Sequence, residues 1–529
     1  MLQINRRRVI LQGESSDEFE TTVGLPQGAV LSPLLYALFI NGLAEELKRQ
    51  HRGVWFYARQ IGILLYADDI VLVAETQEEL QAMLDCAAQY ASAWQFRFNT
   101  KAGKSDVVIV PHDEELAQSA RFYLGPSVEE LSQRDRDRFR LHVSREYKYL
   151  GVEMGRTGKG CWNSYLHRVR RKAMSAMNQL LYSVSGRSWL RLETCLHLFK
   201  TLVRPVLEYA DGVWGAMCSA AGLQLLEQVQ ERFCRRLLRL PSNVSGVYVR
   251  AELGLPSMCE RTRCAAYRFF GKMAMLCKQR RPGGGGPVRL AAYVFEQRCE
   301  AVDRRADWPD REQPHSWCAE MKSMLESAAW SKDVWQAKAV PDDWNKRLRK
   351  NLQQQFRAEA DLRMAGMSSL AVFRQMRTKP DLLWLERCNS HSGAALRLKL
   401  RCGAAPLMER VGASMKIPRE RRTCLMCSSG AVENAEHFAC RCPYYDRLRD
   451  ECVARIEAKL GGHQAPVLRR ALGARDPTVF LGNQLWTELP PELAQAVDST
   501  VCDFLKVAWR RRQPIWSAVC VEGSEWRLA

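Results

Sequence analysis

The stretch from Ile61 to Ala74 constrains the fold most, because two short apolar runs flank a pair of adjacent aspartates, as in I-G-I-L-L-Y-A-D-D-I-V-L-V-A. Short runs of Ile, Leu and Val are typical of buried strands, and the acidic pair falls where a tight turn would join them. The stretch therefore predicts a β-hairpin with Asp68 and Asp69 at its tip. Carboxylates among apolar neighbours need a partner. Mg²⁺ is a natural one, because it takes oxygen ligands and keeps waters and substrate phosphates around it. An ordinary Asp-containing turn is the alternative.

The segment from Gly24 to Asn41 lies just upstream and reads G-L-P-Q-G-A-V-L-S-P-L-L-Y-A-L-F-I-N. Its Gly/Pro-rich loop leads to Ser32 and Pro33, which predict an N-cap followed by proline in the first helical turn. The residues after it predict an amphipathic helix. Its apolar stripe is expected to consist of Leu34, Leu35, Leu38, Phe39 and Leu43.

The G-L-P-Q-G loop, the L-S-P helix start and the Y-A-D-D hairpin together resemble the palm of reverse transcriptases, in particular those of non-LTR (LINE-type) retrotransposons. The resemblance implies an RNA-directed DNA polymerase that copies an RNA template onto a DNA primer or target from dNTPs. Such nucleotidyl transfer uses two Mg²⁺ ions. The resemblance makes Asp68 and Asp69 the catalytic acids, Asp68 as the metal ligand and Asp69 as the supporting acid.

The same resemblance assigns roles to three further segments. Pro26, Gln27 and Gly28 match positions near the incoming nucleotide and template. Lys104, which precedes a Ser and an expected strand, resembles the palm lysine near the nucleotide phosphates better than Lys101 does, although an exposed loop lysine is the alternative. Tyr149, Leu150 and Gly151 belong to a Y-K-Y-L-G hairpin that resembles the primer grip, and this hairpin ends the recognisable palm.

One element that the resemblance requires is not found in this sequence. The family carries its first catalytic aspartate on a strand before the G-L-P-Q-G loop, and residues 1–23 do not resemble that strand. Asp17 lies in a polar run there and is a poor substitute. We therefore expect an N-terminally truncated polymerase with an incomplete two-metal site and an unpaired strand edge beside the hairpin. We expect such a chain to be inactive alone. A non-catalytic RNA- or DNA-binding remnant of a retroelement is the alternative.

Charge supports a nucleic-acid partner. The chain has 78 Lys and Arg against 59 Asp and Glu, a net charge of +19. An excess of this size suits a phosphate backbone. The 19 cysteines, an odd number, and the polar N-terminus without a signal peptide point to a reducing compartment. No uncharged apolar run reaches membrane-spanning length. The resemblance implies a nuclear location, and the oligomeric state stays open.

Helical periodicity dominates after the Y-K-Y-L-G hairpin, so the expected fold class is α+β: an antiparallel palm sheet with helices, then a mostly helical remainder. The basic helices that follow the palm are expected to form a thumb that contacts phosphates of a primer–template duplex. The Gly/Pro-rich run Q-R-R-P-G-G-G-G-P predicts a linker. The expected domains are a partial palm (1–155), a helical thumb (156–280), a linker (281–290), a helical region (291–420), a zinc knuckle (421–450) and a helical tail (451–529).

The zinc knuckle is predicted from Cys424, Cys427, His437 and Cys442. A C-x₂-C step with a later His and Cys is typical of one structural Zn²⁺ held by four ligands, and thiolate and imidazole ligands select zinc over magnesium. The surrounding residues resemble the C-terminal knuckle of LINE-type proteins, whose Cys-Pro step favours Cys442 over its rival Cys440. The basic run from Arg419 to Arg422 just before it would suit phosphate contacts.

Overall fold

A computed structural model describes residues 5–21, 24–26, 28–125, 137–154, 160–184, 191–278, 290–305, 316–328, 330, 332–335, 343–367, 370–376, 392–463, 465–482 and 489–522. The chain divides into two compact units, each of which takes two segments. Unit 1 consists of Met1–Cys161 and Val288–His315, and unit 2 of Trp162–Pro287 and Ser316–Ala529.

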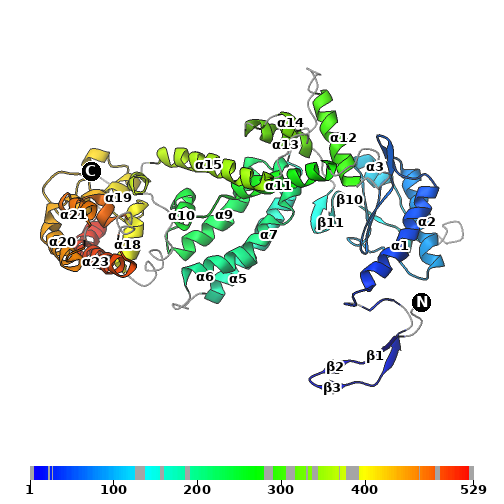
Figure 1. Ribbon diagram of the computed structural model, residues 1–529, viewed down its shortest axis with the longest axis horizontal. Coiled ribbons are helices and arrows are strands. Elements are labelled where there is room, and N and C mark those ends of the chain that lie inside the picture. The colour runs from blue at the N-terminus through cyan, green and yellow to red at the C-terminus, as the bar shows by residue number, and fades with distance from the viewer. Residues whose placement is uncertain are drawn as a thin grey trace. The chain divides into compact units, whose positions relative to one another are not determined.

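Unit 1 combines short strands with four helices among its described residues (Figure 1). The strands are β1 (Asn5–Arg7), β2 (Ile10–Leu11), β3 (Glu14–Ser15), β4 (Phe19–Thr21), β5 (Val54–Phe56), β6 (Arg59–Ile61), β7 (Ile63–Tyr66), β8 (Asp69–Leu72), β9 (Asp106–Val108), β10 (His142–Ser144), β11 (Tyr147–Tyr149) and β12 (Val152–Met154). The helices are α1 (Ser32–Arg49), α2 (Gln77–Ala93), α3 (Glu114–Ser119) and α12 (Leu290–Arg305).

Every sheet among the described residues has two strands. The pairs β1–β4, β2–β3, β5–β6, β7–β8 and β11–β12 are antiparallel, and β9–β10 is parallel. The predicted hairpin at the aspartate pair is confirmed as β7–β8, with Tyr66 opposite Asp69. Because β7 and β8 pair only with each other in the described ranges, both outer edges of this hairpin lack a strand partner.

Helix α1 begins as the sequence suggests but is capped differently. Ser32 is its first residue and not its N-cap, so that prediction is wrong: Leu31 takes the N-cap position, and the Ser32 hydroxyl donates to the Pro26 carbonyl at 2.7 Å. Its predicted apolar stripe is only partly buried. Leu43 is inaccessible, whereas Leu34 and Leu38 are 59% and 67% exposed.

The core of unit 1 lies between α1, α2 and the β7–β8 hairpin. Leu43 and Leu47 of α1 meet Met83 and Leu84 of α2, and Ile70 packs at the margin. Helix α2 starts where Thr76 accepts a hydrogen bond from the backbone of Glu79, a standard N-cap. The strands of the hairpin therefore pack against the core, and its turn is exposed.

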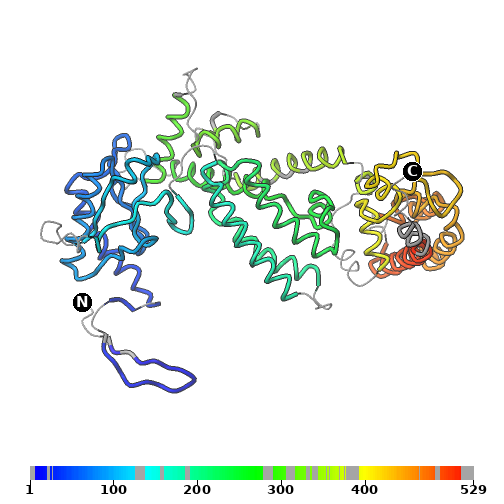
Figure 2. Tube along the Cα trace, turned by 180° about the vertical axis from the view of Figure 1, so that it is seen from behind, coloured from blue at the N-terminus to red at the C-terminus, as the bar shows by residue number. Residues whose placement is uncertain are grey.

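Unit 2 is helical apart from an isolated β-bridge between Thr423 and Val432 in its described residues. Its α-helices are α5 (Asn163–Val184), α6 (Leu192–Leu198), α7 (Arg204–Glu208), α8 (Asp211–Trp214), α9 (Ala220–Leu237), α10 (Gly246–Leu253), α11 (Met258–Lys278), α13 (Trp317–Ser327), α14 (Lys332–Trp335), α15 (Trp344–Ala365), α16 (Ala371–Gln375), α18 (Ser392–Arg401), α19 (Met408–Ser414), α20 (Asp446–Leu460), α21 (Pro466–Gly473), α22 (Pro477–Phe480) and α23 (Pro491–Glu522). Helices α5 and α9 run side by side, as Figures 1 and 2 show.

The α+β fold class predicted from the sequence is confirmed, with small sheets confined to unit 1 except for one bridge and helices elsewhere. The predicted linker, Gln279–Pro287, lies outside the described residues. Residues 288–315 group with unit 1, and the Tyr293 hydroxyl of α12 accepts a hydrogen bond from the Ala58 backbone at 3.1 Å. The domain boundaries stay a prediction. No helix in the described ranges is both long enough and apolar enough to span a membrane.

Candidate functional site

Asp68 and Asp69 lie at the exposed tip of the β7–β8 hairpin. Asp68 occupies the two-residue turn and Asp69 opens β8. Ala67, the first turn residue, has φ +50°, a conformation that hairpin turns of this length require although it is uncommon for alanine. Both carboxylates are solvent-exposed, and neither has a hydrogen bond or ion pair with a described residue. Two adjacent unpaired carboxylates offer oxygen ligands of the kind that hard cations prefer.

Aromatic hydroxyl groups from two other segments lie near this tip. Burial raises the pKa of Tyr36 on α1, and the negative charge of Asp68 raises it further. Burial likewise raises the pKa of Tyr147 and of Tyr149 on β11, with Asp69 as the next contributor in both cases. The helix after the G-L-P-Q-G loop and the Y-K-Y-L-G hairpin therefore each have a tyrosine near the acidic tip.

The predicted nucleotide-binding loop lies before α1. Gly24 and Gly28 have φ of +89° and +88°, which glycine adopts without strain. The Pro26 carbonyl accepts the Ser32 hydroxyl, which fixes the loop to the start of the helix. Gln27 lies outside the described residues.

Lys104 lies in an exposed turn before β9, and its backbone carbonyl accepts the Tyr147 hydroxyl at 2.9 Å. This bond ties the lysine turn to the predicted primer-grip hairpin. In that hairpin Leu150 and Gly151 form the two-residue turn with φ of +47° and +83°, and Tyr149 pairs with Val152. The structure thus brings the lysine turn, the grip hairpin and the acidic tip into one part of unit 1.

The acidic pair is not joined by a third ligand of the same kind. Within the described ranges, no Asp, Glu, His or Cys completes a group of three around Asp68 and Asp69. Asp17, the aspartate considered as a substitute, is exposed in the β3–β4 connection. The residues present therefore fit a divalent cation as part of a ligand set, the rest of which waters or phosphate oxygens could supply.

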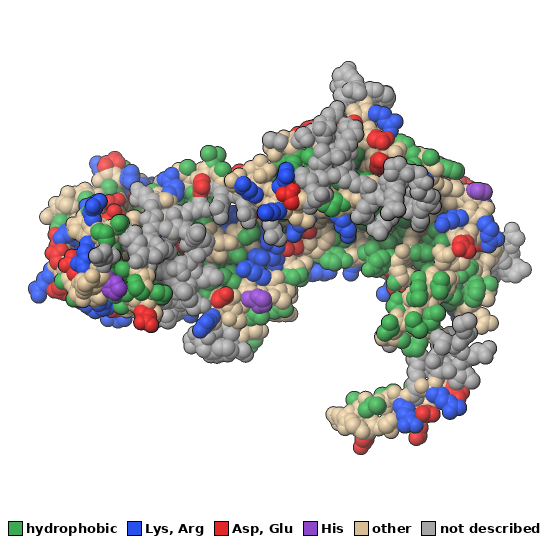
Figure 3. Space-filling view, in the orientation of Figure 1, with side chains coloured by type: hydrophobic (Ala, Val, Ile, Leu, Met, Phe, Trp, Pro, Cys, Tyr) green, Lys and Arg blue, Asp and Glu red, His purple; other side chains and the backbone are tan. Residues whose placement is uncertain are grey.

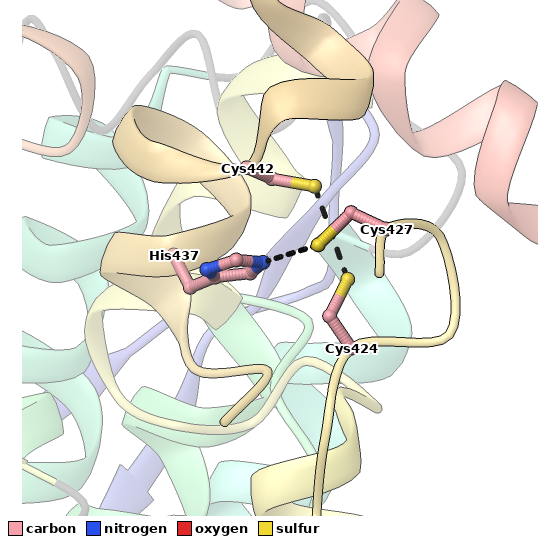
Figure 4. A group of neighbouring side chains, drawn as sticks. All are labelled: Cys424, Cys427, His437 and Cys442. Carbon is pink, nitrogen blue, oxygen red and sulfur yellow. Dashed lines mark hydrogen bonds between the residues drawn. The ribbon is translucent and has the colours of Figure 1, made fainter. Parts of the chain in front are cut away.

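The second cluster is formed by Cys424, Cys427, His437 and Cys442, whose ligand atoms all lie within 4.8 Å of one another. Figure 4 shows the four side chains pointing toward one another from two loops and a helical turn. Cys424 Sγ and Cys442 Sγ are 3.9 Å apart, and Cys427 Sγ and His437 Nε2 are 3.4 Å apart. Tetrahedral coordination with Zn–S of about 2.3 Å and Zn–N of about 2.0–2.1 Å requires separations of about 3.8 and 3.6 Å. The cluster therefore fits one zinc ion.

The lowered pKa of a thiol in the cluster favours the binding of a cation. Hydrogen bonds with Cys442 and with His437 together lower the pKa of Cys424 to about 4, although burial opposes the shift. Hydrogen bonding with Cys424 in turn raises the pKa of His437. Thiolates in such a cluster are both the nucleophilic and the metal-binding form of cysteine. A bound divalent cation would neutralise the charge that these groups carry together.

Local structure fixes each ligand of this cluster. The backbone amide of Met426 donates to Cys424 Sγ at 3.4 Å, and the Asn434 side chain accepts from the His437 amide at 2.7 Å. His437 begins a π-helical turn that runs to Arg441, and the Cys442 amide closes it on the His437 carbonyl at 2.7 Å. The wider π turn allows His437 and Cys442, five residues apart, to face the same point.

Cys440 lies in the same π turn but faces the core and is not part of the cluster. Burial raises the pKa of its thiol to about 12, which keeps it protonated. Its neighbour Ala439 accepts a hydrogen bond from the buried Arg449 at 3.1 Å, and Arg449 also donates to the Cys442 carbonyl. The structure thus places Cys442, and not Cys440, with the other three ligands.

The cluster is held in place by an ion pair that the sequence did not predict. Glu433 and Arg512 form a buried bidentate ion pair, with both N–O distances 2.7 Å, although they are 79 positions apart. Glu433 also accepts the Met408 amide at 2.8 Å. The pair ties the turn that precedes His437 to helix α23.

The basic run before the cluster divides into two kinds of residue. Arg422 donates to the carbonyls of Ile417 and Glu409, so its guanidinium supports the local fold. Arg419 is exposed and pairs with Glu409 at 3.3 Å, a pair that solvent screens. Arg421 is exposed and makes no ion pair with a described residue, so within this run it is the residue most available for a phosphate.

Comparison with known proteins supports the resemblance drawn from the motifs. Residues 2–154 match the family described as reverse transcriptase (RNA-dependent DNA polymerase). The chain is 26% identical over 258 residues to the RNA-directed DNA polymerase from mobile element jockey of Drosophila funebris, a match that covers 47% of this chain and 25% of that protein.

Two further relatives come from a different group of elements. The Pol polyprotein from type-2 retrotransposable element R2DM of Drosophila melanogaster is 27% identical over 256 residues, 46% of this chain and 22% of that protein. The corresponding type-1 R2 protein of Nasonia vitripennis is 44% identical over 61 residues, 12% of this chain and 6% of that protein. The matched part of this chain spans about a quarter or less of each of these three relatives. The similarity to polymerases of non-LTR retrotransposons is confirmed.

Proposed function

We propose that this chain supplies part of the active site of an RNA-directed DNA polymerase of a non-LTR retrotransposon, together with a zinc-stabilised nucleic-acid-binding region. The observation that carries this proposal is the convergence on one acidic tip. Asp68 and Asp69 face hydroxyl groups from the helix after the G-L-P-Q-G loop and from the Y-K-Y-L-G hairpin. A structural turn would need neither the exposed pair nor its surroundings.

In this proposal each segment of unit 1 has one task. Asp68 and Asp69 present carboxylate oxygens, and Mg²⁺ bound there would supply positive charge to substrate phosphates. Lys104 adds a flexible positive charge in the turn held by Tyr147. Pro26, Gln27 and Gly28, by the resemblance, would lie near the template and the incoming dNTP, and Tyr149, Leu150 and Gly151 would position the primer end. Zn²⁺ at the Cys/His cluster would fix the fold of the knuckle.

The experiment is primer extension with Mg²⁺ on a poly-rA template annealed to an oligo-dT primer. The unchanged chain is compared with Asp68→Asn and with a matched control, Asp17→Asn, which removes an exposed carboxylate of the β3–β4 connection. We expect any extension to disappear in Asp68→Asn and to persist in Asp17→Asn. Extension that survives Asp68→Asn would contradict the assignment of Asp68.

A second function is favoured by one observation: no third acidic or other ligand joins Asp68 and Asp69 in the described ranges. A chain with an incomplete metal set would still bind nucleic acid through its net charge of +19. In that case extension would be absent, and binding of the same duplex would fall steeply as salt rises, because released counterions drive phosphate contacts. The nuclear location implied by the resemblance belongs to both versions of the proposal.

A further inference from the structure

A groove between α5 and α9 in unit 2 has the chemistry of a nucleotide site. Its volume is about 360 Å³, which falls in the range of about 300–1,000 Å³ typical of small-molecule pockets. The lining residues are Arg170, Met174, Gln228, Arg232, Arg235, Arg236, Leu240 and Ser242. Lys and Arg side chains gather on this part of unit 2 in Figure 3.

Helical spacing explains why these side chains meet. Arg170 and Met174 are one turn apart on α5, and Gln228, Arg232 and Arg236 are successive turns on one face of α9. The two helices pack against each other, so one row of side chains from each helix lines the groove. Leu240, buried just after the end of α9, closes it.

Most of the positive charge in the groove is uncompensated. Arg235 pairs with Glu231 at 3.1 Å and donates to the Val244 carbonyl, so its guanidinium is part of the fold. Arg170, Arg232 and Arg236 have no carboxylate within ion-pair distance among the described residues. The Nε atom of Arg170 is buried without a hydrogen-bond partner. A buried donor without a partner is unfavourable, and an anion in the groove would satisfy it.

The remaining lining residues select among anions. A bare phosphate needs only the guanidinium groups, which bind it through paired N–H donors. The groove also offers an apolar surface from Met174 and Leu240, and the amide of Gln228 and hydroxyl of Ser242 as hydrogen-bonding groups. Guanidinium planes stack on nucleic-acid bases, and amides read base edges. This combination fits a phosphate with a base attached.

We propose that the groove between α5 and α9 binds one unpaired nucleotide of a nucleic-acid strand, with its phosphate on Arg232 and Arg236 and its base against Met174. A base that is stacked within a duplex cannot enter a concave site, whereas an unstacked base can. The inference shares with the proposed function only the premise that this chain binds nucleic acid. It concerns a single-strand contact within unit 2, whereas the acidic hairpin belongs to unit 1.

The test is equilibrium binding of adenosine monophosphate, ribose 5-phosphate and inorganic phosphate to the full chain. Mg²⁺ is omitted so that the acidic hairpin does not contribute. We expect saturable binding of adenosine monophosphate, tighter than that of ribose 5-phosphate. The double variant Arg232→Ala/Arg236→Ala should weaken it at least about 10-fold, because hydrogen bonds to charged groups are strong. Met174→Ala should weaken the binding of adenosine monophosphate and leave the binding of ribose 5-phosphate unchanged.

The matched control is Arg171→Ala/Lys172→Ala, which removes two exposed positive charges of α5 that do not line the groove. We expect this control to leave adenosine monophosphate binding unchanged. Three results would overturn the proposal: no saturable binding, equal affinity for adenosine monophosphate and ribose 5-phosphate, or equal losses in the control and in the groove variant. None of these measurements uses polymerisation, so a failure of the groove and a failure of the polymerase proposal are distinguishable.

Discussion

The acidic tip of unit 1 and the Cys/His cluster of unit 2 are both candidate cation sites, yet they are built in opposite ways. Asp68 and Asp69 are exposed, belong to one hairpin, and have no side-chain partner in the described ranges. In the cluster, Cys424 and Cys442 are buried, and the ligand atoms already have near-tetrahedral spacing.

The difference teaches what each site can do. A cluster that presents four ligands at coordination distance leaves no open position, which is typical of structural zinc. A pair of exposed carboxylates leaves most positions of a cation open to water and phosphate, as a site that handles a substrate requires. Stability should therefore depend on the cluster and its supports, and activity on the hairpin.

The largest effect is expected from Cys427→Ser. Zinc content should fall from one per chain to zero and the knuckle should unfold, because structural zinc contributes about 10–16 kcal/mol to folding in isolated fingers at pH 7. Metal analysis of the purified chain measures this directly. Cys440→Ala is the matched control and should keep its zinc, because Cys440 faces the core. If Cys427→Ser kept one zinc per chain, Cys427 would not be a required zinc ligand, and the contrast between the two sites would fail.

A smaller loss is expected from Glu433→Gln, which probes the support of the cluster. Arg512 would keep its buried position but lose the charge that it pairs with, and breaking a buried pair in this way costs about 3–5 kcal/mol. Urea unfolding should show this loss. Glu451→Gln, which breaks the exposed pair with Arg447, should cost less than about 1 kcal/mol. Equal costs for the two variants would mean that Glu433 does not support the cluster.

The next effect concerns pH and a half-buried acid of unit 2. Burial raises the pKa of Asp211 from 3.8 to about 7, and the charge of Glu208 adds to the shift, whereas Arg268 and Arg261 oppose it. The folded chain then binds this proton more tightly than the unfolded chain does. The contribution of Asp211 to stability is therefore largest below about pH 4, and it is lost as pH rises from about 4 to 7.

Asp211→Asn should remove that pH dependence and stabilise the chain above pH 7. A shift of about three pKa units corresponds to about 4 kcal/mol, and partial exposure of the carboxyl reduces the expected gain to about 2 kcal/mol. Urea unfolding at several pH values measures it. Glu420→Gln, at an exposed carboxylate, serves as the control and should change nothing. An unchanged pH slope in Asp211→Asn would show that the group titrates normally.

Local patterns made part of this structure predictable. Two short apolar runs around a turn predicted the β7–β8 hairpin, and the Ser32-Pro33 step with the apolar periodicity after it predicted α1, whose observed bounds are Ser32–Arg49. The spacing of Cys and His predicted the members of the cluster. In each case the signal lies within about twenty consecutive residues.

The features that the sequence did not predict involve residues far apart in the chain or an apolar face that no other described element covers. The Glu433–Arg512 pair and the buried Arg397–Asp498 pair join residues 79 and 101 positions apart, and such pairs leave no periodic pattern. The apolar stripe of α1 is exposed at Leu34 and Leu38, which the sequence did not predict, since periodicity shows that a face is apolar but not that another element covers it.

The smallest effect on stability is expected at the acidic tip itself. Asp68→Asn and Asp69→Asn should each change the free energy of unfolding by less than about 0.5 kcal/mol, because exposed side chains without partners contribute little. Thermal or urea unfolding of unit 1 measures this. A loss above about 2 kcal/mol would mean that a carboxylate holds the turn together, and the tip would then be a structural turn like any other. A neutral result, combined with loss of extension in Asp68→Asn, would separate activity from stability at the place where the two sites differ most. The reverse pattern, stability lost and activity kept, is the one expected of the zinc cluster.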